Sequence, residues 1–269
     1  MSMIVMSDPR VAAIPVRDCG EPLVDVRTGP LPLLVDDRRS DPAGAFAHLR
    51  ARVRDQLVAA QERLLDGLRL LVVEGYRPPE LQTQYFERYT RRLRSEHPRW
   101  TEQQVREAAG RYVSPPEIAP HSAGAAVDLT LVDADGRELD MGTAMNATPE
   151  DSDGACFADA TNIPAAAKAN RAVLTTALTD AGLQPYPFEW WHLSLGDRYG
   201  ALMQGQPAAL YGPTTWTRNC PRPAATCPVS RSLRRANAQD EQEQSDDRGT
   251  EKTGMAGPLR GREGISAGK

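Results

Sequence analysis

The stretch Pro120-His-Ser-Ala-Gly-Ala-Ala-Val-Asp-Leu-Thr-Leu131 joins a proline-rich loop to an apolar segment. We expect a strand over residues 127–132, because apolar and branched residues run up to the hairpin signal Asp133-Ala-Asp-Gly136. Small residues follow His121 and allow close approach to a pocket. Asp128 is a carboxylate within an apolar strand, which is unfavourable unless it is paired or bound to a metal.

A second stretch, Phe188-Glu-Trp-Trp-His192, adds another carboxylate and another imidazole, in a chain that holds four histidines. Two imidazoles and a carboxylate can hold Zn²⁺ with one position left for water. We therefore expect His121, Asp128 and His192 to bind zinc and Glu189 to take a proton from that water. Each residue alone has a simpler explanation, such as a polar loop for His121 and a salt bridge or turn cap for Asp128.

The spacing of Glu189 and His192 sets a geometric condition. Residues three apart in a regular strand point to opposite faces of the sheet. Both side chains can reach one metal only if the chain bends between them or if Glu189 precedes the strand. Pro185 and Pro187 favour such a bend. The alternative is a tryptophan-rich core strand with polar groups at its edge.

Arg77 lies between Tyr76 and Pro78 at the end of an expected strand, Leu68–Val73. Its guanidinium is permanently charged and can stabilise an oxyanion or bind a carboxylate through two hydrogen bonds. A surface arginine in a turn is an equally good explanation from the residues alone.

Composition excludes several classes of protein. The chain has 269 residues, 40% hydrophobic and 25% charged, with a net charge of −4. These are ordinary globular values, and no basic stripe with interleaved aromatics is present, so we expect no nucleic-acid partner. No apolar run approaches the ~18 residues of a membrane span, and Met1–Asp8 does not resemble a secretory signal, so we expect a cytoplasmic protein without membrane association. The four cysteines are too few for a disulfide framework.

Three regions differ in composition. Residues 1–40 are expected to form an irregular N-terminal arm that packs on the domain, with a short strand near Leu23–Val26. Residues 41–213 are expected to form the catalytic domain. Residues 218–269 contain almost no large apolar side chains, so we expect a disordered C-terminal tail.

Within the domain, local signals predict most of the elements. We expect helices over residues 41–66, Glu80–Glu96, from the N-cap Thr101 onward, and Ile163–Ala181, a long loop over 143–160, and a last strand at Phe188–Leu195.

Four motifs together resemble a known family. They are Gly75-Tyr-Arg-Pro78, His121 to Leu131, Leu139-Asp-Met-Gly142 and Glu-Trp-Trp-His192. In this order and spacing they resemble the zinc D-alanyl-D-alanine dipeptidases of the VanX type, over about Ile14 to Pro213. That family belongs to the D,D-peptidases with a hedgehog/lysostaphin-like fold.

The resemblance implies an α+β fold with a central antiparallel sheet flanked by helices. It also implies one Zn²⁺ per chain on His121, Asp128 and His192, with Glu189 as the catalytic base and Arg77 stabilising the oxyanion. Trp190 and Trp191 would wall the site, and Asp140-Met-Gly142 would shape the loop leading to the substrate pocket.

Two positions depart from the family pattern. A carboxylate thought to pair with the substrate ammonium aligns with Asn146, and Ala119 replaces a serine two residues before the first histidine. A charge-assisted hydrogen bond is stronger than a neutral one, so we expect weaker selection for a free amino group.

We therefore expect a small dipeptide substrate, D-Ala-D-Ala or a close D-amino-acid dipeptide. The alternatives are a D,D-carboxypeptidase acting on peptidoglycan stem peptides and a non-catalytic zinc-binding module. The sequence leaves the oligomeric state open.

Overall fold

The computed structural model describes residues 3–37, 41 and 43–216. All of these lie in one unit, Met1–Ala225, and the expected tail, 218–269, lies outside the described residues. Among the helices of the described part, none is long and apolar enough to cross a membrane.

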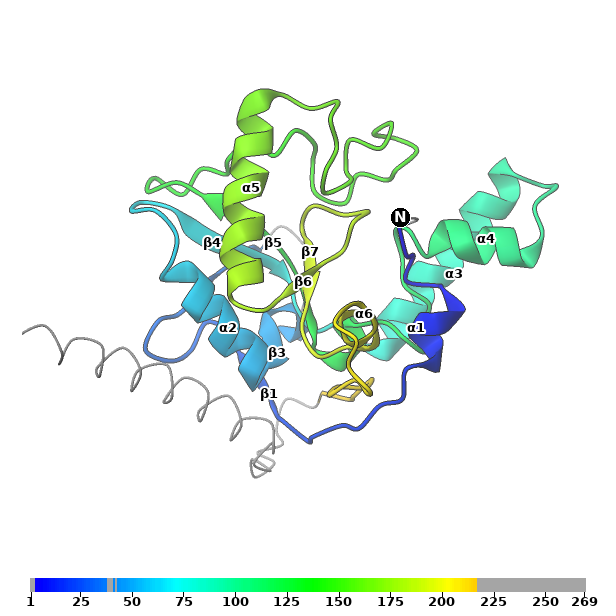
Figure 1. The fold of residues 1–269 in the computed structure, drawn as a ribbon, viewed down its shortest axis with the longest axis horizontal. Coiled ribbons are helices and arrows are strands. Elements are labelled where there is room, and N and C mark those ends of the chain that lie inside the picture. The colour runs from blue at the N-terminus through cyan, green and yellow to red at the C-terminus, as the bar shows by residue number, and fades with distance from the viewer. Residues whose placement is uncertain (1–2, 38–40, 42, 217–269) are drawn as a thin grey trace, which may run out of the picture. The chain divides into compact units, whose positions relative to one another are not determined.

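A five-stranded sheet forms the centre of this unit (Figure 1). Its strand order is β2-β4-β5-β7-β6. The strands are β2 (Leu34–Val35), β4 (Arg69–Glu74), β5 (Ala126–Val132), β7 (His192–Ser194) and β6 (Gln184–Pro185). All neighbours pair antiparallel except the edge strand β2, which runs parallel to β4. The expected α+β class is confirmed, and the sheet is antiparallel apart from this edge.

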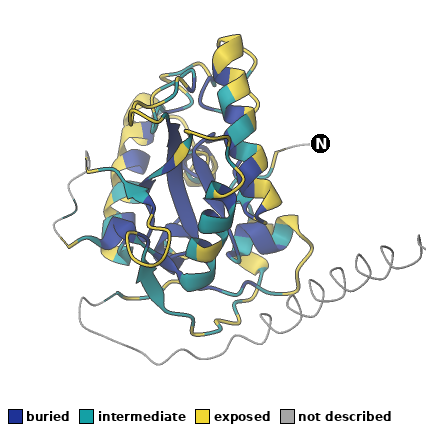
Figure 2. Ribbon diagram, turned by 90° about the vertical axis from the view of Figure 1, so that its left-hand side faces the viewer, coloured by how far each residue is buried: buried dark blue, intermediate teal, exposed yellow. Residues whose placement is uncertain are grey.

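The middle strand β5 is buried along its whole length, as the dark blue sheet between helices in Figure 2 shows. Its alternate residues Val127, Leu129 and Leu131 belong to the main core, together with apolar side chains of α2 (Ala51–Gln61) and α5 (Ala165–Asp180). Successive side chains of a strand point to opposite faces. The residues between them, Asp128 and Thr130, therefore lie on the other face, where the candidate site is found.

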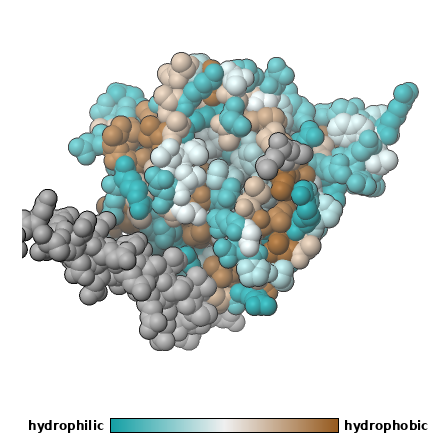
Figure 3. Space-filling view, in the orientation of Figure 1, coloured by the Kyte–Doolittle hydropathy of each residue, from teal (hydrophilic) through white to brown (hydrophobic). Residues whose placement is uncertain are grey.

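A helix pair, α3 (Pro79–Glu96) and α4 (Glu102–Ala109), packs through its own apolar cluster and lies at the right of Figure 1. The same region is largely hydrophilic on the face drawn in Figure 3. Proline at the first turn starts α3, because its missing N–H is not needed there. Thr101 is the N-cap of α4, as expected, and it forms a capping box with Gln104.

The remaining elements are short. The N-terminal segment contributes α1 (Pro9–Ala13), which packs against α6 (Arg198–Met203). It also contributes β1 (Leu23–Asp25), which pairs with β3 (His48–Arg50) in a separate two-stranded sheet.

The expected helix over residues 41–66 is wrong in its first part. Residues Ala45–Ala47 form a 3₁₀ turn, β3 follows, and α2 begins only at Ala51 and ends at Gln61. The reason is tertiary: the backbone N–H groups of Gly75 and Tyr76 donate to the carbonyls of Phe46 and His48. Phe46 in the 3₁₀ turn and Leu49 in β3 are both buried, so their helix-like spacing reflects burial and not a helix.

Candidate metal centre and active site

Strand register brings two of the expected ligands together. Asp128 of β5 is the Cα partner of His192 of β7 and also of Glu74 of β4. His121 comes from the 3₁₀ turn His121–Ala123, which leads into β5. Gly124 ends this turn at φ +65°, and a Cβ there would lie 2.2 Å from Cδ2 of Leu23. The left-handed φ favours glycine in this turn, which leads from His121 into β5.

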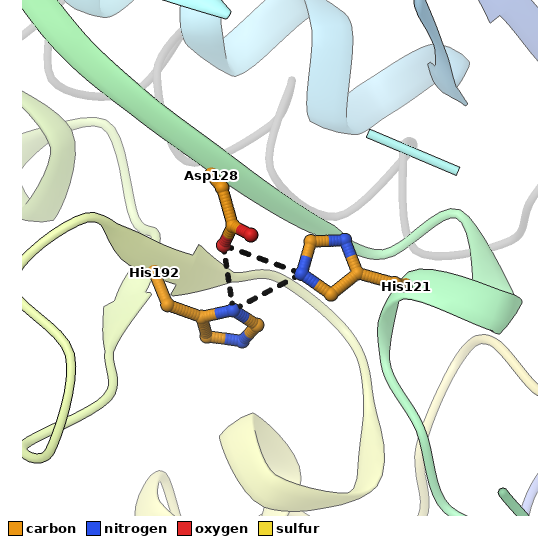
Figure 4. A group of neighbouring side chains, drawn as sticks. All are labelled: His121, Asp128 and His192. Atoms are coloured by element: carbon orange, nitrogen blue, oxygen red, sulfur yellow. Dashed lines mark hydrogen bonds and ion pairs between the residues drawn. The ribbon is translucent and has the colours of Figure 1, made fainter. Parts of the chain in front are cut away.

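Three donor atoms form a small buried triangle (Figure 4). Oδ1 of Asp128 lies 3.3 Å from Nε2 of His121 and 3.0 Å from Nδ1 of His192, and the two nitrogens are 3.2 Å apart. A tetrahedral zinc with bonds of about 2.0–2.1 Å separates its ligand atoms by about 3.3 Å. The donor set and its spacing therefore fit a zinc ion, and these three residues are the one such cluster within the described part of the chain.

A hydrogen bond to the backbone leaves one nitrogen of His121 free to coordinate. Nδ1 of His121 lies 2.7 Å from the carbonyl of Gly75. A carbonyl only accepts, so Nδ1 must carry the proton, and the lone pair of Nε2 faces the cluster. Burial lowers the pKa of His192, which keeps its imidazole neutral. Burial alone would raise the pKa of Asp128, but the two imidazoles lower it well below its usual range.

Glu189 satisfies the geometric condition set by its spacing. It precedes β7 in a turn that the N–H of His192 closes by donating to the Glu189 carbonyl at 3.3 Å. Its Oε2 lies 3.8 Å from Nδ1 of His192, so both side chains reach the same place. Burial and the negative charge of Asp128 raise the pKa of Glu189 well above its usual range, although Arg77 opposes this. A carboxylate of raised pKa is suited to accept and return a proton near neutral pH.

Arg77 is a buried residue of the site, 9% exposed, rather than a surface arginine. Its Nε donates to Oε1 of Glu74 at 2.5 Å and its Nη1 to Oε1 of Gln82 at 2.8 Å. Burial would lower the pKa of Arg77, but Glu74 raises it above its usual value. Neither of these bonds uses Nη2.

Sequence reasoning missed Glu74 and Gln82. Glu74 ends an apolar strand and is fully buried, and a buried carboxylate requires a partner. The sequence shows the position of Glu74 at the end of an apolar run, so its need for a partner could have been predicted. The contact between Gln82 and Arg77 depends on how α3 packs in the fold, which the sequence does not show.

A cavity of about 410 Å³ opens onto the triangle. All five expected site residues line it, and so does Asn146. Its other wall is formed largely by α3, through Tyr85, Arg88, Tyr89 and Arg92. The volume is in the range of small-molecule sites.

The two tryptophans and the Asp140-Met-Gly142 segment lie elsewhere. Neither Trp190 nor Trp191 lines this cavity. Trp191 is 1% exposed within the core, and Nε1 of Trp190 donates to Oγ1 of Thr143 at 2.9 Å. Asp140, Met141 and Gly142 line a separate cavity of about 490 Å³, together with Trp190. They support the loop that carries Asn146 rather than contact the site, and the buried Ala119 does not line the site either.

The family of this chain is one of metallopeptidases. Residues 48–207 match the model of the M15 peptidase family described as D-ala-D-ala dipeptidase, and the chain belongs to this family. Peptidases of this family are metal-dependent.

The curated relatives carry the same name. A D-alanyl-D-alanine dipeptidase of Synechocystis sp. (strain ATCC 27184 / PCC 6803 / Kazusa) is 28% identical over 229 residues, covering 72% of this chain and 90% of the relative. That of Escherichia coli (strain K12) is 31% identical over 132 residues, covering 49% of this chain and 57% of the relative. Among solved structures, the D,D-pentapeptidase VanY in complex with Zn(II) is 16% identical, with a TM-score of 0.37, covering 73% of this chain and 95% of VanY.

Proposed function

We propose that the protein hydrolyses D-Ala-D-Ala or a close D-amino-acid dipeptide, with one Zn²⁺ per chain held by His121, Asp128 and His192. The observation that carries the proposal is the buried donor triangle with Glu189 beside it at one end of the cavity. The names of the three curated relatives support the choice of substrate. The expected cytoplasmic location belongs to the same proposal, and cell fractionation would test it.

The chemistry divides between the metal and the chain. A bound Zn²⁺ lowers the pKa of water and polarises a carbonyl. Glu189 takes the proton from the water at a carboxylate oxygen and returns it to the leaving amine. Nη2 of Arg77 donates to the oxygen on which negative charge develops, while Glu74 and Gln82 keep the guanidinium from turning away.

The arrangement of Glu189 and Arg77 argues against a non-catalytic zinc-binding module. A module that only binds metal has no need of a buried carboxylate beside the ligands or of a buried arginine pinned by two partners. The two groups that hydrolysis requires both line the cavity. A D,D-carboxypeptidase is not favoured either, because all three curated relatives are named as dipeptidases.

Glu189→Gln tests the proposal, since it preserves shape and removes the base. We expect the variant to keep bound zinc, measured by metal analysis, and to lose about 10²–10⁴-fold in kcat on D-Ala-D-Ala. Glu102→Gln is the matched control and should keep full activity, because Glu102 is exposed, pairs with Arg94 at 2.6 Å and does not line the cavity. Full activity of zinc-loaded Glu189→Gln would show that another group is the base.

A further inference from the structure

One face of α3 forms the wall of the cavity. Tyr85, Arg88, Tyr89 and Arg92 line it, and their spacing of three, four and seven residues places them on one side of a helix. The face therefore presents two cations and two phenols to whatever occupies the cavity.

The cations of the cavity differ in their partners. Arg77 pairs with Glu74 at 2.5 Å. Arg92 pairs with Glu96 at 2.7 Å and with Asp151 at 3.2 Å. Arg88 forms no ion pair with any residue that the structure describes, and its guanidinium carbon lies 5.0 Å from the ring centroid of Tyr85.

The acidic side chains of the cavity do not neutralise the charge of Arg88. Only Asp128 and Glu189 among the lining residues are acidic. Asp128 belongs to the donor triangle and Glu189 lies beside it. Arg88 is thus the uncompensated cation of the cavity, available to an anionic group of a ligand.

Arg77 and Arg88 share one aromatic ring. The guanidinium carbon of Arg77 also lies 5.0 Å from the centroid of Tyr85. The guanidinium carbons of Arg77 and Arg88 can therefore be separated by at most twice this distance. In a dipeptide, the scissile carbonyl and the terminal carboxylate are one residue apart, about 3.3–3.6 Å in an extended chain. Each guanidinium hydrogen bond adds about 2.9 Å. A dipeptide beside Tyr85 can therefore place its carbonyl at Arg77 and its carboxylate at Arg88.

We propose that Arg88 binds the terminal carboxylate of the dipeptide and selects for substrates in which this group is free. The inference rests on the proposed function, because it assigns a specificity residue to the same site. A guanidinium matches a carboxylate through two parallel hydrogen bonds, and the cation–π contact with Tyr85 favours the position of Arg88 beside the cavity. Arg88 acts on binding, whereas Arg77 acts on the oxygen that becomes charged.

The test compares D-Ala-D-Ala with D-alanyl-D-alaninamide, which lacks the terminal charge, on the zinc-loaded full-length protein. We expect the wild type to prefer the acid. In Arg88→Gln, KM for the acid should rise about tenfold with little change in kcat, and KM for the amide should stay the same, because a hydrogen bond to a charged group is lost only with the acid. Arg88→Lys keeps the charge and should restore part of the preference.

Arg91→Gln is the matched control, since Arg91 lies on the same helix, pairs with Glu87 at 3.6 Å and does not line the cavity. It should leave the acid-to-amide preference unchanged. An unchanged preference in Arg88→Gln would overturn the inference. An equal loss on both substrates would also overturn it, because that result indicates a packing role on Tyr85.

The wild type separates the two proposals. If it hydrolyses the acid and the amide equally well, the role of Arg88 is refuted while the proposed dipeptidase function stands. If the zinc-loaded protein hydrolyses neither, the proposed function fails and the role of Arg88 fails with it.

Discussion

Gly142 offers a sharp test of how the loop beside the site is held. It adopts φ +83°, and an added Cβ would lie 2.8 Å from Cβ of Ile163, 2.9 Å from its Cγ2 and 3.2 Å from Cβ of Ala167. Gly142→Ala therefore combines an unfavourable backbone conformation with a steric overlap against α5 and the residues before it. Gly136 is the control, since it has φ +80° and nothing within 4 Å of an added Cβ.

The two costs can be separated. A left-handed conformation costs an L-residue about 1–2 kcal/mol, which both variants share. Overpacking adds about 1–3 kcal/mol, and only Gly142→Ala carries this. We expect Gly136→Ala to lower the free energy of unfolding by about 1–2 kcal/mol and Gly142→Ala by about 2–5 kcal/mol. For a domain of this size, each kcal/mol lowers Tm by roughly 2–4 °C.

Denaturant unfolding of both variants, with zinc present at equal concentration, measures the difference. We also expect Gly142→Ala to raise KM, because the loop that follows carries Asn146 to the cavity. If Gly142→Ala is no less stable than Gly136→Ala, the packing of this loop against Ile163 and Ala167 is not as described.

Two further predictions concern the site itself. Removing zinc with a chelator should lower Tm and abolish hydrolysis, and added Zn²⁺ should restore both. The stabilisation is about 4 kcal/mol when free zinc is a thousandfold above its Kd, and a Tm that does not respond to zinc would exclude the buried triangle as the site. Arg77→Lys should lower kcat about 10²–10³-fold in steady-state assays, with little loss of zinc. A lysine is a single point charge and cannot hold Glu74, Gln82 and a substrate oxygen together, so an activity near that of the wild type would remove Arg77 from the mechanism.

Elements with local signals were predictable. The helix Glu80–Glu96 has proline at its start and Pro98 beyond its end, and Thr101 caps the next helix. The strand over residues 127–132 was visible from its apolar run. These signals depend on side chains within a few residues of each other, so they can be recognised in the sequence.

The structure of the segment before Ala51 could not be predicted from local signals. Its apolar spacing matched a helix, but its carbonyls accept hydrogen bonds from Gly75 and Tyr76. A backbone partner nearly thirty residues away leaves no local trace, and it overrides a weak helical preference.

The sequence by itself determined the chemistry of this protein: the residue types, the motif order and the bend required between Glu189 and His192. Tertiary structure decided how that chemistry is assembled. Asp128 and His192 meet through strand register, His121 joins them through a glycine turn, and docking of α3 turns Tyr85 and Arg88 toward the cavity. Pairing and docking are interactions between segments far apart in the chain, so spacing within one segment cannot specify them.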